Sequence, residues 1–390
     1  MSLGDQVLSG ASNFLTVALV ARSTSPHGFG QFALAYAVLL VLVTLVRGVW
    51  GTPIALAGSP LGSLNEARRY LSAAMVAAPI MVLLVAGPTL VLTRTDHWPV
   101  TVVVAVAAPI VCGQDLCRFA AVSADRPAVA VVSDSIWLVV VALGYVFRPS
   151  PYGALGIWAA GASVGLLFAM VSLRLRPRIR SGASALKSWH STGVGVAALT
   201  VLVQVASYIT LVLATVAVGA SSAAALRGAS SVMAPVNTLL SFLALGLLPA
   251  VHRVHPNRQL GMVARIALGI LVLTALWCSV LLLTPPSIGE LLLGDTWPLT
   301  RHILPWTSLE YLFVAVANTA ILGFQARQAG RLLVNVGIGG AALMISTSVV
   351  AAFMASSATP FAIAQVVAMA IGTAVIWTIC VRMMRRSPSV

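Results

Sequence analysis

Long apolar segments follow one another along nearly the whole chain, and they limit what this sequence can fold into. About twelve of them reach the roughly 20 residues that an α-helix needs to cross the hydrocarbon core of a bilayer. With 59% hydrophobic and only 8% charged residues, the chain cannot cover this apolar surface as a soluble domain would. The sequence therefore predicts an all-α, polytopic membrane protein. The segments lie near residues 4–22, 30–57, 70–92, 99–124, 128–147, 153–173, 190–216, 222–250, 261–284, 302–325, 331–354 and 359–381.

The net charge of +14 follows from where the basic residues fall. Of the 23 Lys and Arg residues, 16 fall on one side of the predicted spans and three fall within spans. The other side holds Arg22, Arg94, Arg148 and Arg301. Because cytoplasmic loops are enriched in Lys and Arg, we expect a cytoplasmic-membrane protein with both termini in the cytoplasm. The same residues suit contact with anionic membrane lipids, and no nucleic acid is expected as a partner.

The second half of the chain weakly repeats the first. NFLTVAL at 13–19 matches SYITLVL at 207–213, and DHWP at 96–99 matches DTWP at 295–298. Arg126 and Asp134 correspond in order to Arg327 and Asn335. Six predicted spans in each half return the chain to its starting side, so the halves are parallel repeats. We expect an N-terminal lobe over 1–173, a basic cytoplasmic linker over 174–189 and a C-terminal lobe over 190–390.

Three stretches carry a resemblance to a known family. They read GDQVLSGASNFLTVALVARSTSPHGFGQFALAYAV (4–38), QDLCRFAAVSADRP (114–127) and LLLGDTWP (291–298). They resemble Wzx-type polysaccharide flippases of the multidrug/oligosaccharidyl-lipid/polysaccharide (MOP) superfamily, which also contains the MATE drug exporters. The resemblance implies twelve helices in two six-helix lobes around a central cavity, and translocation of an undecaprenyl-diphosphate-linked oligosaccharide. The implied partners are this lipid-linked oligosaccharide, a polysaccharide polymerase, glycosyltransferases, and a coupling proton or sodium ion.

Charged residues inside the spans are the candidate site. Asp115 and Arg118 share a face of one predicted helix, and Asp134 in the next helix lies at a similar depth. A diphosphate suits the two-pronged guanidinium group, so Arg47 and Arg118 could hold phosphate while Asp115 and Asp134 orient them. A buried structural network remains the alternative for Asp115, Arg118 and Asp134. Arg47 has no acidic neighbour in sequence, which favours a substrate role for it.

Three further polar residues complete the candidate set. Glu310 and Asn318 are expected to face the cavity, and Glu310 is either a protonatable coupling group or a neutral buried acid. Arg227 is expected near the outer start of its span, where its side chain can snorkel to the interface.

The motifs of nucleotide hydrolysis and zinc catalysis are absent from the sequence, so we expect no enzyme activity. Cys112, Cys117, Cys278 and Cys380 lack metal-ligand spacing, and we expect no metal or cofactor. Two alternatives to a flippase stay open: an ion-coupled, MATE-like exporter of small amphipathic molecules, and a non-transporting scaffold of a polysaccharide assembly complex.

Overall fold

The computed structural model describes residues 3–385 except 58, 94–97, 148, 187–190, 243–246 and 328. Arg94, Arg148 and the first two residues of the DHWP motif therefore lie outside the described residues. Within them, every regular element is helical, and ten helices are long and apolar enough to cross a membrane. The protein is a multi-pass membrane protein, as the sequence predicts.

The first half of the chain forms an N-terminal bundle whose helices begin at clear local signals. Ser25 and Ser150 each accept a hydrogen bond from a backbone N–H three residues on, and a proline follows each of them at the first helical position. Asp125, with a φ of 57°, closes one helix before Pro127 opens the next. The elements are α1 (Leu3–Ser23), α2 (Pro26–Val46), η1 (Arg47–Gly51), α3 (Thr52–Ala55), α4 (Pro60–Thr93), α5 (Trp98–Ser123), α6 (Pro127–Phe147), α7 (Pro151–Ser172) and α8 (Ile179–Leu186).

The second half forms a C-terminal bundle. Its elements are α9 (Ser191–Ala217), α10 (Ala220–Val232), α11 (Ala234–Phe242), α12 (Leu248–Arg253), α13 (Pro256–Leu283), α14 (Pro286–Leu293), η3 (Gly294–Thr296), α15 (Trp297–Ala326), α16 (Gly330–Met354) and α17 (Thr359–Arg385). Trp297 begins α15 just as Trp98 begins α5. The tryptophans of the repeated motif thus open helices at corresponding places in chain order.

Three predicted elements differ in the structure. The span predicted at 222–250 is broken into α10, α11 and α12. The span predicted at 70–92 starts ten residues earlier, at Pro60, and α4 is about 51 Å long at 1.5 Å per residue. The segment predicted as a linker contains a helix that was not predicted, α8, which packs against α4. A Cβ on Gly182 of α8 would lie 2.2 Å from the carbonyl oxygen of Ser72, so only glycine permits this approach.

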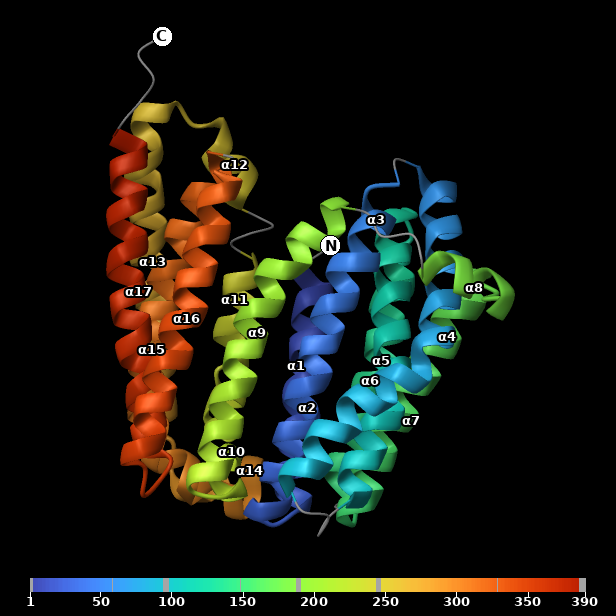
Figure 1. Cartoon of the computed structure of the whole chain (residues 1–390), viewed down its shortest axis with the longest axis horizontal. Coiled ribbons are helices and arrows are strands. Elements are labelled where there is room, and N and C mark those ends of the chain that lie inside the picture. The colour runs from blue at the N-terminus through green and yellow to red at the C-terminus, as the bar shows by residue number, and fades with distance from the viewer. Residues whose placement is uncertain are drawn as a thin grey trace.

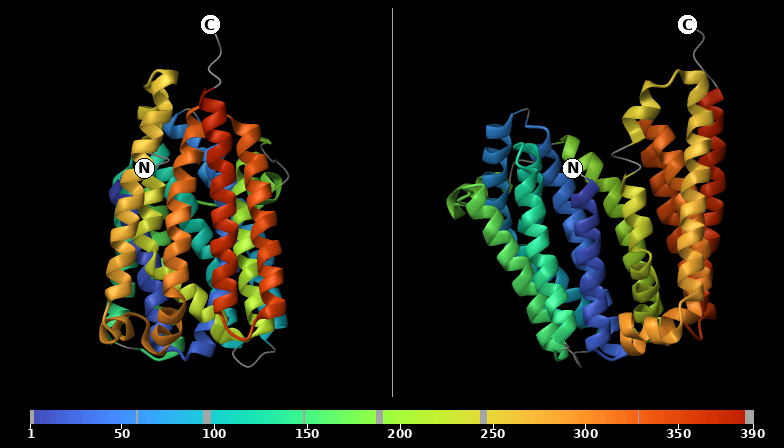
Figure 2. Two further views of the ribbon diagram at one scale, coloured as in Figure 1. Left: turned by 90° about the vertical axis from the view of Figure 1, so that its left-hand side faces the viewer. Right: turned by 180° about the vertical axis from the view of Figure 1, so that it is seen from behind.

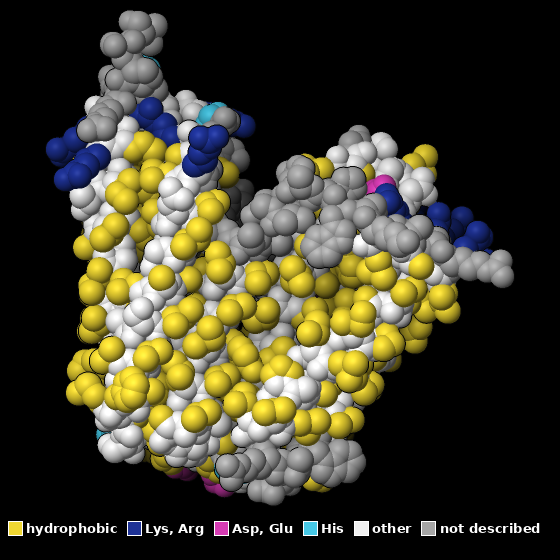
Figure 3. All heavy atoms as spheres, viewed as in Figure 1, with side chains coloured by type: hydrophobic (Ala, Val, Ile, Leu, Met, Phe, Trp, Pro, Cys, Tyr) yellow, Lys and Arg dark blue, Asp and Glu magenta, His cyan; other side chains and the backbone are white. Residues whose placement is uncertain are grey.

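The two bundles meet along one face (Figures 1 and 2), which we call the interbundle face. On it, α1, α2 and η1 of the N-terminal bundle pack against α9, α10, α11 and α14 of the C-terminal bundle. The bundles diverge toward the end where α1 begins and α17 ends, and Figure 3 shows the molecule hollowed there, with Lys and Arg side chains gathered at the rim. Yellow apolar side chains cover the sides in the same view, as contact with lipid requires.

The opposite end is closed by direct contacts between the bundles. A Cβ on Gly30 of α2 would lie 1.8 Å from the carbonyl oxygen of Ala220 in α10. Tyr145 in α6 donates a hydrogen bond to the carbonyl oxygen of Leu291 in α14, and Gly294 abuts the backbone of Arg22. The structure is therefore open at the arginine-rich end and closed at the other.

Candidate functional site

A two-pronged ion pair joins η1, which continues α2, to α5. Arg47 donates two hydrogen bonds of 2.7 Å to the Asp115 carboxylate, from Nε to Oδ2 and from Nη2 to Oδ1. Arg47 has no acidic neighbour in sequence, but Asp115 meets it from another helix. The pair is asymmetric: 45% of the Arg47 side chain is exposed, against 6% for Asp115. Since η1 packs against α9, this exposed edge of Arg47 belongs to the interbundle face.

Arg118 extends the Arg47–Asp115 contact into the interior of the N-terminal bundle. Its Nη1 lies 3.9 Å from Asp115 Oδ1, and its Nε lies 3.5 Å from Asp134 Oδ2 in α6. Gln114 donates to Asp134 Oδ1 at 2.6 Å, while Ser133 donates to the carbonyl oxygen of Gly165 in α7. These contacts tie α2, α5, α6 and α7 together, and we refer to Arg47, Asp115, Arg118, Asp134 and Gln114 as the ionic network.

The ionic network brings together Asp115, Arg118 and Asp134, which the sequence placed at similar depth, and adds Arg47 from η1. Two arginines face two aspartates, so their formal charges cancel. Arg118, Asp115 and Asp134 are all buried, which favours a structural role for these three. Arg47 alone keeps an edge of its guanidinium on the interbundle face.

The helix changes its winding where Arg47 emerges. Residues Arg47–Gly51 form a π-helical turn, in which the Thr52 N–H bonds to the carbonyl oxygen of Arg47. Such turns are rare and occur frequently at functional sites. Gly51 lies against the ring of Phe119, where a Cβ would come within 3.2 Å, and Trp50 stacks on Tyr70 of α4. Gly51 thus lets η1 pack closely on α5.

A second polar group lies across the interbundle face, deeper toward the closed end. Arg227 of α10 places its guanidinium carbon 4.9 Å from the ring centroid of Tyr36 in α2. The Tyr36 hydroxyl donates to Asn13 Oδ1 of α1 at 3.2 Å. In the C-terminal bundle, Asn237 of α11 donates to the Tyr311 hydroxyl of α15 at 3.1 Å. We call Asn13, Tyr36, Arg227, Tyr311 and Asn237 the deep polar cluster.

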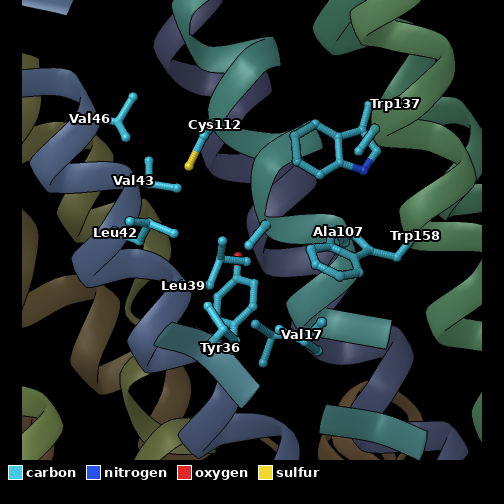
Figure 4. Close-up of a cluster of buried hydrophobic side chains, with 14 of the residues drawn as sticks. Val17, Tyr36, Leu39, Leu42, Val43, Val46, Ala107, Cys112, Trp137 and Trp158 are labelled. Atoms are coloured by element: carbon cyan, nitrogen blue, oxygen red, sulfur yellow. The ribbon is translucent and has the colours of Figure 1, made fainter. Parts of the chain in front are cut away.

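Tyr36 is held firmly by its own bundle. Its ring stacks on Phe32 at 5.1 Å between centroids and meets the edge of Trp158 at 6.2 Å. Figure 4 shows it among Val17, Leu39 and other apolar side chains of this core. The ring can therefore present a fixed aromatic face to Arg227.

Arg227 lies seven residues inside α10 rather than at its start, so the expected snorkelling at the interface does not describe it. None of the described acidic residues forms an ion pair with it, and its Nε is buried without a hydrogen-bond partner. A guanidinium stays charged at any cellular pH. Contact with a tyrosine ring stabilises such a cation only in part, so Arg227 offers a site to an anion.

Glu310 and Asn318 do not join either group of contacts. Glu310 is half-buried and forms none of the ion pairs found among the described residues. Asn318 donates to the carbonyl oxygen of Val314 in its own helix at 2.8 Å. Sequence reasoning missed Asn13, Tyr36, Asn237 and Tyr311. The available signal was a polar side chain within an apolar span, which Asn13 and Asn237 both carry.

Comparison with known proteins gives a fold but no family assignment by sequence. No family model matches the chain, and no curated protein matches it. Among solved structures, the chain resembles an inward-facing MATE-family multidrug resistance transporter of the MOP superfamily, with a TM-score of 0.74 and 13% identity over 97% of this chain and 96% of the other. An outward-facing MATE transporter gives a TM-score of 0.56 and 12% identity over 100% of both chains.

The lipid II flippase MurJ, in an inward closed conformation, is also similar. Its TM-score is 0.63, with 10% identity over 96% of this chain and 85% of that one. The predicted all-α membrane fold is thus confirmed, and it is the fold of solved MATE and MurJ transporters.

Proposed function

We propose that the protein is a flippase that moves a polyprenyl-diphosphate-linked oligosaccharide across the cytoplasmic membrane by alternating access. The observation that carries the proposal is Arg227, a permanent cation on the interbundle face with no carboxylate partner among the described residues. Diphosphate is a multiply charged anion that a guanidinium can bind through two hydrogen bonds.

Arg47 adds a second cationic edge at a different depth. Arg47 and Tyr36 are eleven residues apart in one continuous helical stretch of α2 and η1, which is about 16 Å at 1.5 Å per residue. In the open-ended state a diphosphate at the level of the inner leaflet would meet Arg47 first and Arg227 later. The polyprenyl tail would stay in lipid beside the apolar outer surface.

The shape of the molecule agrees with an inward-open state of such a cycle. The open end carries the arginines that the sequence places in the cytoplasm, and the closed end holds the contacts at Gly30, Tyr145 and Gly294. Rocking the bundles about the interbundle face would exchange open and closed ends. The greater similarity to the inward-facing than to the outward-facing MATE transporter supports the same assignment.

A MATE-like exporter of small amphipathic molecules is the second candidate. Its support is the fold similarity and Glu310, a half-buried carboxyl that could exchange a coupling proton. Two guanidinium groups on the interbundle face favour an anionic over a cationic substrate. A non-transporting scaffold would not need these two guanidinium groups inside the membrane, where a charged side chain is costly.

The test uses proteoliposomes containing a fluorescent polyprenyl diphosphate N-acetylglucosamine, whose outer-leaflet fraction is read by impermeant quencher. We expect the wild type to speed transfer, Arg227→Ala to slow it about tenfold or more, and Arg227→Lys to fall between them. Arg265→Ala is the matched control, because Arg265 is exposed and bonds only to its own helix. Transport of a cationic dye, without any effect on the diphosphate lipid, would establish the exporter instead.

A further inference from the structure

Two asparagines, one from each bundle, expose their side chains in the interior of the structure's spans. Asn13 lies near the middle of α1, and Asn237 lies in α11 within the broken span. An amide in hydrocarbon is costly unless all of its polar groups are hydrogen-bonded, so an exposed asparagine at this depth is favoured where polar groups or water can reach it. The space between the bundles can supply one, and lipid cannot.

The contacts of the two asparagines place them on the interbundle face. Asn13 accepts from Tyr36, and Tyr36 lies against Arg227 of the opposite bundle. Asn237 donates to Tyr311 of α15, and α15 packs on α10, the helix that carries Arg227. The Tyr36–Arg227 contact thus joins the two bundles beside Asn13, and Asn237 lies on α11, which packs against α1.

The asparagines also lie at similar depth. A Cβ on Gly10 would come within 2.6 Å of Thr238 Oγ1, so α1 and α11 touch at these two residues. The two helices run antiparallel. Asn13 therefore lies three residues from Gly10 toward the closed end, and Asn237 lies one residue from Thr238 toward the same end. Their backbones therefore differ in depth by about 3 Å.

Each asparagine is oriented by a tyrosine of its own bundle. The Tyr36 hydroxyl donates a hydrogen bond to Asn13 Oδ1, so the two N–H groups of Asn13 Nδ2 take no part in this contact. The Asn237 amide is fixed through its donation to Tyr311, whose ring is half-buried. Planar amides with a defined donor or acceptor edge, next to tyrosine hydroxyls and rings, match the neighbouring hydroxyl groups of a sugar. None of the five residues of the deep polar cluster is acidic, and Arg227 gives the cluster a positive charge.

We propose that Asn13 and Asn237, oriented by Tyr36 and Tyr311, form a carbohydrate subsite that binds sugar hydroxyls between the two bundles. This inference rests on the proposed flippase function. It assigns recognition of the sugar part of the substrate to the deep polar cluster. In depth the subsite lies between Arg47 and Arg227, within reach of a glycan whose diphosphate is held at either arginine. Since one asparagine comes from each bundle, a bound sugar would hold the bundles together at this depth.

The test compares the binding of two lipids to the full chain in nanodiscs: polyprenyl diphosphate, and polyprenyl diphosphate N-acetylglucosamine. We expect the wild type to bind the glycosylated lipid more tightly. Asn13→Ala and Asn237→Ala should each weaken that binding about five- to tenfold, the loss of one or two neutral hydrogen bonds. Binding of the bare diphosphate lipid should stay unchanged, which also shows that each variant is folded.

Asn318→Ala is the matched control, because that side chain bonds to its own helix; both lipids should bind it as they bind the wild type. If Asn13→Ala fails to fold, Asn13→Gln keeps the amide but moves it, and the same selective loss is expected. Equal binding of both lipids by the wild type, or equal losses for both lipids in the asparagine variants, would overturn the subsite and leave the flippase proposal standing. Binding of neither lipid would refute the flippase proposal itself.

Discussion

Asp115 is the centre of the ionic network, and its removal should be more damaging than removal of Arg47. Its carboxylate accepts both hydrogen bonds from Arg47 and lies 3.9 Å from Arg118. Asp115→Asn therefore removes a negative charge that attracts both Arg47 and Arg118, and Arg118 is buried. Removing one partner of a buried ion pair costs about 3–5 kcal/mol, and we expect Asp115→Asn to fall in this range.

Arg47→Gln should cost less, about 2 kcal/mol, for two reasons. Asp115 keeps Arg118 as a partner after the change. The Arg47 side chain is also 45% exposed, so the pair is screened more than a fully buried one. In the double variant no lone carboxylate or guanidinium remains at this contact, and the two losses should overlap by about 2 kcal/mol.

The assay is a double-mutant cycle on the unfolding of the purified protein in mixed micelles, followed by tryptophan fluorescence. The control cycle is Glu66→Gln with Arg69→Gln, a pair at 3.6 Å whose side chains are both about a third exposed; its coupling should stay below about 0.5 kcal/mol. A parallel cycle of Asp115→Asn with Arg118→Gln should also show positive coupling. Additive losses for Arg47 and Asp115, within the error of the control cycle, would refute the view that this contact stabilises the N-terminal bundle.

Three further predictions concern packing and topology. Gly30→Ala places a methyl group 1.8 Å from the Ala220 carbonyl oxygen, so it should force α2 and α10 apart at the closed end. An impermeant maleimide added at that end should then label Asn13→Cys, whereas Gly156→Ala, with open space around it, should leave labelling low. Gly182→Val should release α8 from Ser72 and expose the segment around Arg178 to trypsin, with Gly261→Val as the unhindered control; unchanged cleavage would contradict the packing. Reporters fused before α1 and after α17 should both be active only in the cytoplasm, and an extracytoplasmic signal from either would reverse the orientation argued from the arginines.

Much of the fold could be predicted from local properties of the sequence. An apolar run of about 20 residues has few options in a bilayer, because its backbone polar groups must bond within the segment. Pairs such as Ser25–Pro26 and Ser150–Pro151 mark helix starts by hydrogen-bond chemistry that involves only neighbours. The break in α10–α12 was not predicted, because apolar composition alone does not show where a helix is interrupted. The docking of α8 was missed for a related reason, since it depends on a glycine that meets a carbonyl 110 residues away.

The same distinction between local and long-range properties applies to the candidate site. The sequence by itself determined which charged residues enter the membrane and that Asp115, Arg118 and Asp134 share a depth, because helix rise and hairpin turns are local geometry. Only the tertiary structure decided their partners. It placed Asp115 against Arg47 from 68 residues away, buried Arg118 between two carboxylates, and left Arg227 facing a tyrosine instead of an acid. Pairing of charges depends on which helix faces share the interbundle contact, and the packing of many side chains sets those faces.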